Sequence, residues 1–178
     1  MTVVVLAGGT GGAKLARGML DVVGPDELVV VANTADDVEV HGAHVSPDPD
    51  LIAFWLADRI DSRGWGLDGD TFTVMDHLRA LGEDPWFSLG DEDLALGIAR
   101  KRRVDAGERL TDVTADLFAR MGVPGRVLPM CDEPVRTKIK SGGRDWDFQE
   151  WMIREGGKDG AAPIEGVYFF GRRDARPT

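Results

Sequence analysis

Two segments near the N-terminus carry the residue types that phosphate chemistry uses, and the first is GGTGGAK, Gly8 to Lys14. Its four glycines let the backbone approach a ligand closely and present N–H groups, and its lysine adds a positive charge. The segment lacks the third glycine of G-x-G-x-x-G and the ending of G-x-x-x-x-G-K-[ST]. It predicts a non-standard phosphate-binding turn, with a tight packing turn as the alternative. The predicted binding residues are Gly8, Gly9, Thr10, Gly11, Gly12 and Lys14.

The second segment is acidic and holds Asp36, Asp37, Asp48 and Asp50 within fifteen positions. Carboxylate oxygens bind Mg²⁺, and the metal then binds the oxygens of a diphosphate. One carboxylate can instead accept a proton from an attacking hydroxyl. We therefore expect a Mg²⁺ site beside a phosphorylated small molecule. A solvated acidic loop, or aspartates that cap turns, is the alternative.

Other reactive side chains predict less. His41 and His44 have no cysteine partner, so zinc is weakly indicated and a packing or hydrogen-bonding role is favoured. Cys131 has no activating base near it in sequence, which argues against a nucleophilic role. Trp86 and Phe87 can stack on a flat ring, although buried core aromatics are commoner.

The elements that must position these segments form a βαβ unit. Continuous apolar runs at residues 3–7 and 28–32 are typical of strands buried in a parallel sheet. Residues 14–23 fit a helix that Gly24 and Pro25 end. Ligands of open α/β sheets bind at the carboxyl ends of the strands, where both segments would lie.

From Leu51 to about Val123 the spacing of apolar residues is helical, which predicts an insertion over residues 51–123. We expect Asp91 and Thr111 to act as N-caps there. Strand patterns return in GRVLPM, VRTKIKSGG and WDFQEWMIRE, and IEGVYFFG reads as a buried strand. The expected helices span residues 51–60, 72–81, 91–103 and 111–121.

These patterns predict an α/β fold, a Rossmann-like three-layer sandwich with a mostly parallel sheet and an α-helical insertion. Residues 1–178 would form a single domain. Doubly wound sheets usually have about five or six strands, whereas two or three parallel strands are readable here. We therefore expect a partial domain that lacks the C-terminal part of the fold.

Composition narrows the class of partner. The chain has 31 acidic and 21 basic residues and a net charge of −10, so a nucleic-acid partner is not expected. No apolar run reaches the ~20 residues of a membrane span, and no signal peptide is evident. With one cysteine and no disulfide framework, a cytoplasmic location is expected.

Several motifs together resemble the N-terminal half of the 2-phospho-L-lactate transferase family, which builds the deazaflavin coenzyme F(420). The resemblance covers most of the chain in the same order. It rests on GGTGGAKLARG, ANTADDVEVHGAHVSPDPD, GWGLDGDTF, LGDEDLA, GERLTDVTADL, LPMCDEPVRT and FQEWMIRE.

The resemblance implies a reaction in which a 2-phospholactyl or phosphoenolpyruvyl group moves from a guanosine diphosphate-linked donor to the 5′-hydroxyl of the deazaflavin precursor Fo. GMP leaves, Mg²⁺ assists, and the enzyme is a homodimer. The implied roles are substrate binding by Gly8 to Gly12, Lys14, Asn33, Asp50 and Ser88, metal binding by Asp36, Asp37 and Asp48, and contact of Asp50 with the deazaflavin or its hydroxyl.

Three departures from the family pattern stand out. Glu92 replaces an arginine, Gly97 stands where a histidine is expected, and Ser88 stands where many members have a basic residue. Two other functions stay open. One is a nucleotide- or deazaflavin-binding module without catalysis, and the other is an NAD(P)-dependent oxidoreductase on a similar fold.

Overall fold

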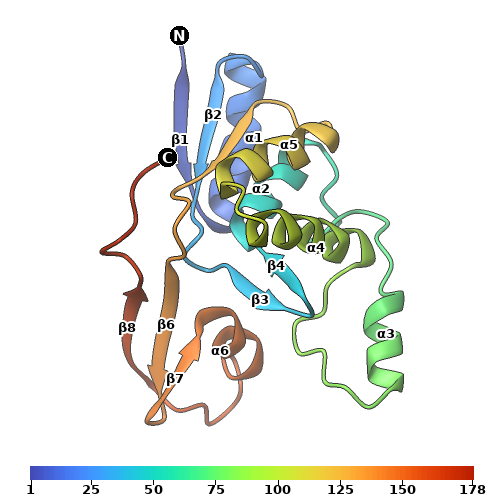
Figure 1. Ribbon diagram of the computed structural model, residues 1–178, viewed down its shortest axis with the longest axis vertical. Coiled ribbons are helices and arrows are strands. Elements are labelled where there is room, and N and C mark those ends of the chain that lie inside the picture. The colour runs from blue at the N-terminus through green and yellow to red at the C-terminus, as the bar shows by residue number, and fades with distance from the viewer.

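The sheet that carries the predicted ligand edge has three parallel strands in the order β1-β2-β5. They are β1 (Val3–Ala7), β2 (Leu28–Ala32) and β5 (Arg126–Pro129). The computed structural model describes residues 1–178 and confirms both strands of the predicted βαβ unit (Figure 1). Val3 pairs with Leu28 and Ala7 with Ala32, so β1 and β2 end side by side.

One face of this sheet is covered by helices α1 (Gly9–Val23), α2 (Pro47–Leu56) and α5 (Leu110–Arg120). Fully buried Ala13 and Ala16 let α1 lie close to the strands. On β1, the alternate side chains of Val4 and Leu6 are 56% and 80% exposed. The α/β fold is as predicted, and the chain contributes the sheet with one helical layer of the sandwich.

The region after β2 begins with a hairpin that the sequence did not predict. Strands β3 (Val38–Val40) and β4 (Ala43–Val45) pair antiparallel around His41 and Gly42, both at positive φ. The next helix, α2, begins at Pro47 rather than at residue 51. Proline suits the first helical turn because its missing N–H has no partner to lose there. Asp48 and Asp50 therefore lie in a helix and not in the expected loop.

The predicted helical insertion is confirmed, with α2 and α5 joined through α3 (Thr73–Ala80) and α4 (Asp91–Asp105). The predicted N-caps are wrong. Asp91 accepts the backbone N–H groups of Thr73 and Val74 at the start of α3, while Asp70 accepts those at the start of α4. The first residue of α4 thus caps the start of α3, and a residue of the loop before α3 caps the start of α4.

Thr111 also has a role other than the predicted one. It lies inside α5, whose N-cap position is Arg109, and its hydroxyl donates to the carboxylate of Asp132 at 2.6 Å. No helix of the structure has the length and apolarity needed to cross a bilayer.

The C-terminal part forms a separate antiparallel sheet in the order β7-β6-β8, below the main sheet in Figure 1. Its strands are β6 (Arg136–Ser141), β7 (Arg144–Asp147) and β8 (Ile164–Phe170). Gly142 and Gly143, both at positive φ, make the predicted hairpin turn. Two predictions are wrong. WDFQEWMIRE becomes helix α6 (Phe148–Arg154) after Asp147, and β8 is a largely exposed edge strand.

Candidate functional site

Asn33, the first residue after β2, gathers two of the predicted metal carboxylates. Its side-chain N–H donates to Asp36 at 3.0 Å and to Asp48 at 2.9 Å. Its side-chain oxygen accepts the backbone N–H of Ala35, which fixes the orientation of the amide. Asp36 comes from the loop after β2 and Asp48 from the first turn of α2. The carboxyl edge of the sheet therefore holds a carboxylate pair around one amide, made of two of the four aspartates expected at this edge.

The glycine segment is the first turn of α1 and not a turn that precedes a helix at residue 14. Gly9 has φ +63, a conformation that favours glycine, and its N–H donates to Asp48 at 2.8 Å. A Cβ on Gly8 would lie 3.1 Å from an oxygen of Asp48, and one on Gly12 would lie 2.8 Å from the Cβ of Ala7. These glycines therefore let α1, β1 and α2 meet closely.

The charges at this edge suit a cation. Burial raises the pKa of Asp36, and the neighbouring negative charge of Asp48 raises it further. A divalent cation between the two carboxylates would relieve this repulsion. No group of three or more His, Cys, Asp or Glu residues is arranged so that it could hold a metal ion. Mg²⁺ commonly uses one or two carboxylates with water and substrate phosphates, so the pair fits that metal.

Asp37 is not part of this pair. It is 3% exposed, and its carboxylate contacts His44 Nε2 at 2.8 Å and accepts the hydroxyl of Ser46 at 2.7 Å. The structure therefore places it in a buried hydrogen-bond network of the hairpin. His44 has the hydrogen-bonding role that the sequence favoured over zinc, and His41 Nε2 lies 3.0 Å from the carbonyl of Phe87.

Asp50 faces a residue that sequence reasoning missed. Arg100 of α4 is fully buried and holds both carboxylate oxygens of Asp50, and it also donates to the carbonyl of His44 at 2.9 Å. Burial raises the pKa of Asp50, and the charge of Arg100 opposes that rise. The missed signal was the position of Arg100 four residues after Leu96, on the buried side of α4.

The remaining predicted residues lie outside the carboxylate pair. Thr10 and Gly11 are exposed on the first turn of α1. Lys14 Nζ is 5.6 Å from the centre of the Trp55 ring, and the Ser88 hydroxyl accepts from Arg79 at 3.2 Å. Their contacts with substrate, like that of Asp50, stay predictions.

The structure shows what surrounds two of the residues that depart from the family pattern, Glu92 and Gly97. Glu92 pairs with Arg59 at 2.7 Å. A Cβ on Gly97 would lie 2.9 Å from the Cβ of Ala43 and 3.2 Å from the carbonyl oxygen of His44. Glycine at this position therefore lets α4 pack directly on β4. A larger side chain would not fit between them without a shift.

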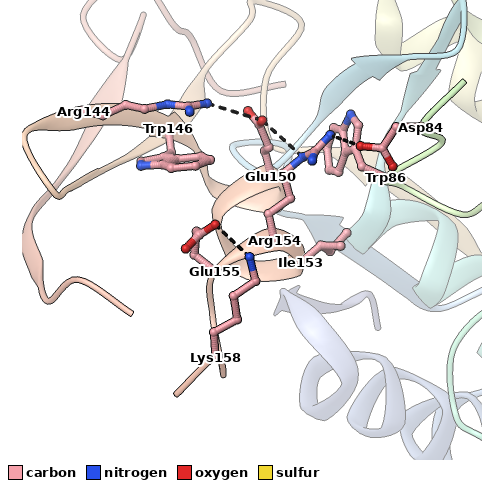
Figure 2. A pocket seen from close by; sticks show the side chains of 9 residues that line it. All are labelled: Asp84, Trp86, Arg144, Trp146, Glu150, Ile153, Arg154, Glu155 and Lys158. Atoms are coloured by element: carbon pink, nitrogen blue, oxygen red, sulfur yellow. Dashed lines mark hydrogen bonds and ion pairs between the residues drawn. The ribbon is translucent and has the colours of Figure 1, made fainter. Parts of the chain in front are cut away.

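A hollow of about 400 Å³ lies between α6 and the loop before α4 (Figure 2). Its charged side chains satisfy one another. Arg154 pairs with Asp84 at 2.7 Å and with Glu150, Arg144 also reaches Glu150, and Lys158 pairs with Glu155. This network explains how α6 is held against the loop, and it leaves no charge unpaired for a ligand.

A second hollow, of about 350 Å³, lies beside the carboxylate pair and has Asn33 in its wall. Apolar side chains and two arginines form the rest of it. Cys131 also lines it, and burial raises the pKa of that thiol, which agrees with the expectation that it is not a nucleophile.

A parallel sheet with a glycine-rich helix start and carboxylates at its carboxyl edge defines an α/β protein of the Rossmann-like class. The family model described as 2-phospho-L-lactate transferase CofD matches residues 3–178. The chain belongs to this family.

Curated relatives agree with the family. The chain is 37% identical to a 2-phospho-L-lactate transferase of Methanosarcina mazei, over 97% of this chain and 56% of the relative. It is also 37% identical to a phosphoenolpyruvate transferase of Kitasatospora aureofaciens, over 100% of this chain and 57% of the relative. The chain thus spans little more than half the length of these relatives.

Solved structures support the fold. The chain aligns with a crystal structure of protein BH3568 from Bacillus halodurans, with a TM-score of 0.54 and 16% identity, over 99% of this chain and 53% of the other. A second crystal structure of that protein, a member of the UPF0052 family, gives a TM-score of 0.56 at 14% identity, over 100% and 54%. At such identity the likeness concerns the fold alone.

Proposed function

We propose that this chain forms the donor-phosphate side of a transferase site. The reaction moves a 2-phospholactyl or phosphoenolpyruvyl group from a guanosine diphosphate-linked donor to the 5′-hydroxyl of Fo, and GMP leaves. The observation that carries the proposal is the bridge from Gly9 to Asp48, Asn33 and Asp36, at the end of β1 and β2. Family membership supplies the reaction class.

Asp36 and Asp48 would hold Mg²⁺, with Asn33 orienting both carboxylates. The bound ion would neutralise charge on the diphosphate. The exposed N–H groups at the start of α1, at Thr10 and Gly11, would donate to phosphate oxygens, since a helix N-terminus favours negative charge. The chain would act by positioning and charge neutralisation rather than through a covalent intermediate.

Asp50 would support this arrangement through Arg100. The ion pair joins the first turn of α2 to α4, and the same turn carries Asp48. We keep the predicted contact of Asp50 with the acceptor hydroxyl as part of the proposal. It requires that a carboxylate oxygen leave Arg100 when the acceptor binds.

The direct test is release of GMP from donor, Fo and Mg²⁺ by the 178-residue chain, followed by chromatography. Production of GMP that falls at least tenfold in Asp48→Asn supports the proposal. A chain that binds neither GDP with Mg²⁺ nor Fo would contradict it.

A second function, a binding module without catalysis, is favoured by Glu92 and Gly97, which stand where the family pattern has an arginine and a histidine. It predicts a thermal shift with GDP and Mg²⁺ but no GMP from the donor. The homodimer stays a proposal, and light scattering of the purified chain measures it.

A further inference from the structure

The hollow beside Asn33, here called the arginine pocket, has a composition that differs from the rest of the surface. Met130, Val135 and Phe169 give it an apolar wall, and Arg172 and Arg176 add two positive charges. It lies where the segments that follow β2, β5 and β8 meet. An apolar cleft with a few charged groups is the usual form of a small-molecule site.

Neither guanidinium of the arginine pocket forms an ion pair or a hydrogen bond, and the hydrogen bond of Arg176 comes from its backbone N–H. Most arginines elsewhere, such as Arg17, Arg100 and Arg103, pair with carboxylates, as expected in a chain with a net charge of −10. Arg102, Arg126, Arg136 and Arg173 do not, and none of these four lines the pocket. The segment that carries Arg172 and Arg176 is nevertheless held in place.

Three backbone or hydroxyl contacts hold that segment. The backbone N–H of Arg176 donates to Glu133 at 3.0 Å, and Thr178 donates to the carbonyls of Pro129 and Met130. The pocket thus presents two unpaired arginines on an anchored backbone. Guanidinium groups bind carboxylate and phosphate oxygens in a two-pronged geometry.

The arginine pocket shares Asn33 with the carboxylate pair. A ligand with its phosphates at the pair would therefore have its next group at this pocket. In the proposed donor that group is a three-carbon acid with one carboxylate and one methyl or methylene carbon. The carboxylate suits the two arginines, and the methyl or methylene carbon suits the apolar wall.

We propose that the arginine pocket binds the three-carbon end of the donor, with its carboxylate between Arg172 and Arg176. The inference rests on the proposed function and adds the part of the site that recognises the transferred group. A guanine ring in the same pocket is the competing occupant, and the test separates the two.

The test is isothermal titration of the full chain, in Mg²⁺ buffer, with phosphoenolpyruvate, ethyl phosphate and GDP. Arg172→Gln and Arg176→Gln should each weaken phosphoenolpyruvate binding at least tenfold. Ethyl phosphate has no carboxylate and GDP has no three-carbon acid, so their affinities should stay within twofold. The matched control is Arg173→Gln, which removes an exposed arginine that does not line the pocket. Circular dichroism checks that each variant is folded.

Unchanged phosphoenolpyruvate binding in both variants, or no phosphoenolpyruvate binding by a chain that binds GDP, would overturn the inference and leave the proposed function standing. Equal loss of GDP and phosphoenolpyruvate would place the nucleotide in the pocket instead. Equal loss in Arg173→Gln would show only long-range charge attraction and would also overturn it. If the chain bound none of the three ligands, both the proposed function and this inference would be contradicted.

Discussion

Asp50 and Arg100, fifty residues apart in sequence, form an ion pair that is closed to solvent, with exposures of 4% and 0%. The pair ties the start of α2 to the middle of α4 and so connects the helical insertion to the carboxyl edge of the main sheet. The terminal nitrogens of Arg100 donate to Asp50 and to the carbonyl of His44, while its buried Nε has no partner.

Loss of Arg100 should therefore destabilise the fold. Arg100→Met leaves the Asp50 carboxylate buried without its partner, and breaking a buried pair in this way costs about 3–5 kcal/mol of unfolding free energy. Urea unfolding followed by circular dichroism measures it. Arg103→Met is the control on the same helix, because Arg103 pairs with Glu108 and Asp116 at the surface and should matter little. Equal stability of Arg100→Met and the parent chain would disprove the structural role.

Gly12 and Gly11 should respond differently to the same added methyl group. In Gly12→Ala the Cβ would meet Ala7, with 2.8 Å to its Cβ and 3.0 Å to its Cα, so α1 must move away from β1. We expect a loss of about 1–3 kcal/mol in stability and at least tenfold weaker binding of GDP with Mg²⁺. In Gly11→Ala the Cβ has open space, so the fold should be unaffected. Titration of GDP measures the difference, and equal affinities would contradict the close approach.

Replacement by alanine should change stability in opposite directions at two helical glycines, Gly97 and Gly18. Gly97→Ala would push α4 off Ala43 and the carbonyl of His44, which should cost about 1–3 kcal/mol. Gly18→Ala in α1 has no neighbour within 4 Å and should stabilise by about 0.5–1 kcal/mol, because alanine loses less backbone entropy. Both are read from urea midpoints. A stabilising Gly97→Ala would show that the contact between α4 and β4 is looser than described.

Asp93 should make stability depend on pH. Burial, and then the charge of Asp50, raises the pKa of Asp93 to about 7, while Arg100 lowers it and Asp70 raises it. Between about pH 4 and 7 the unfolded chain releases this proton and the folded chain keeps it, so stability falls as pH rises through that range. With allowance for partial exposure, the change is on the order of 2 kcal/mol.

Asp93→Asn removes the titrating proton and should lose that part of the pH dependence. Relative to the parent chain, the variant should gain stability from pH 4 to pH 7 and show no further gain above it. Urea unfolding at each pH measures the difference. A constant difference across the range would show that Asp93 titrates normally. Asp68→Asn, which changes an exposed carboxyl on the loop before α3 that forms no ion pair, is the control for a charge change alone.

Much of the fold follows from local patterns. The sequence predicted β1 and β2 from their continuous apolar runs. It predicted α3, α4 and α5 from the helical spacing of their apolar residues. The hairpin of β3 and β4 and helix α6 were missed. Strands of three residues are too short to show alternation, and α6 follows directly from β7 at Asp147 without a turn residue.

The sequence by itself determined the family, the parallel sheet and the gathering of acidic residues near the glycines. Only the tertiary structure decided which aspartates face each other. Asp36 and Asp48 share Asn33, whereas Asp37 turns to His44 and Asp50 to Arg100. Spacing along the chain could not separate these roles, because each carboxylate takes its place from an element that packs against it. The partners of Asp50 and Asp48 lie 50 and 39 residues away, and only folding brings them within a hydrogen bond.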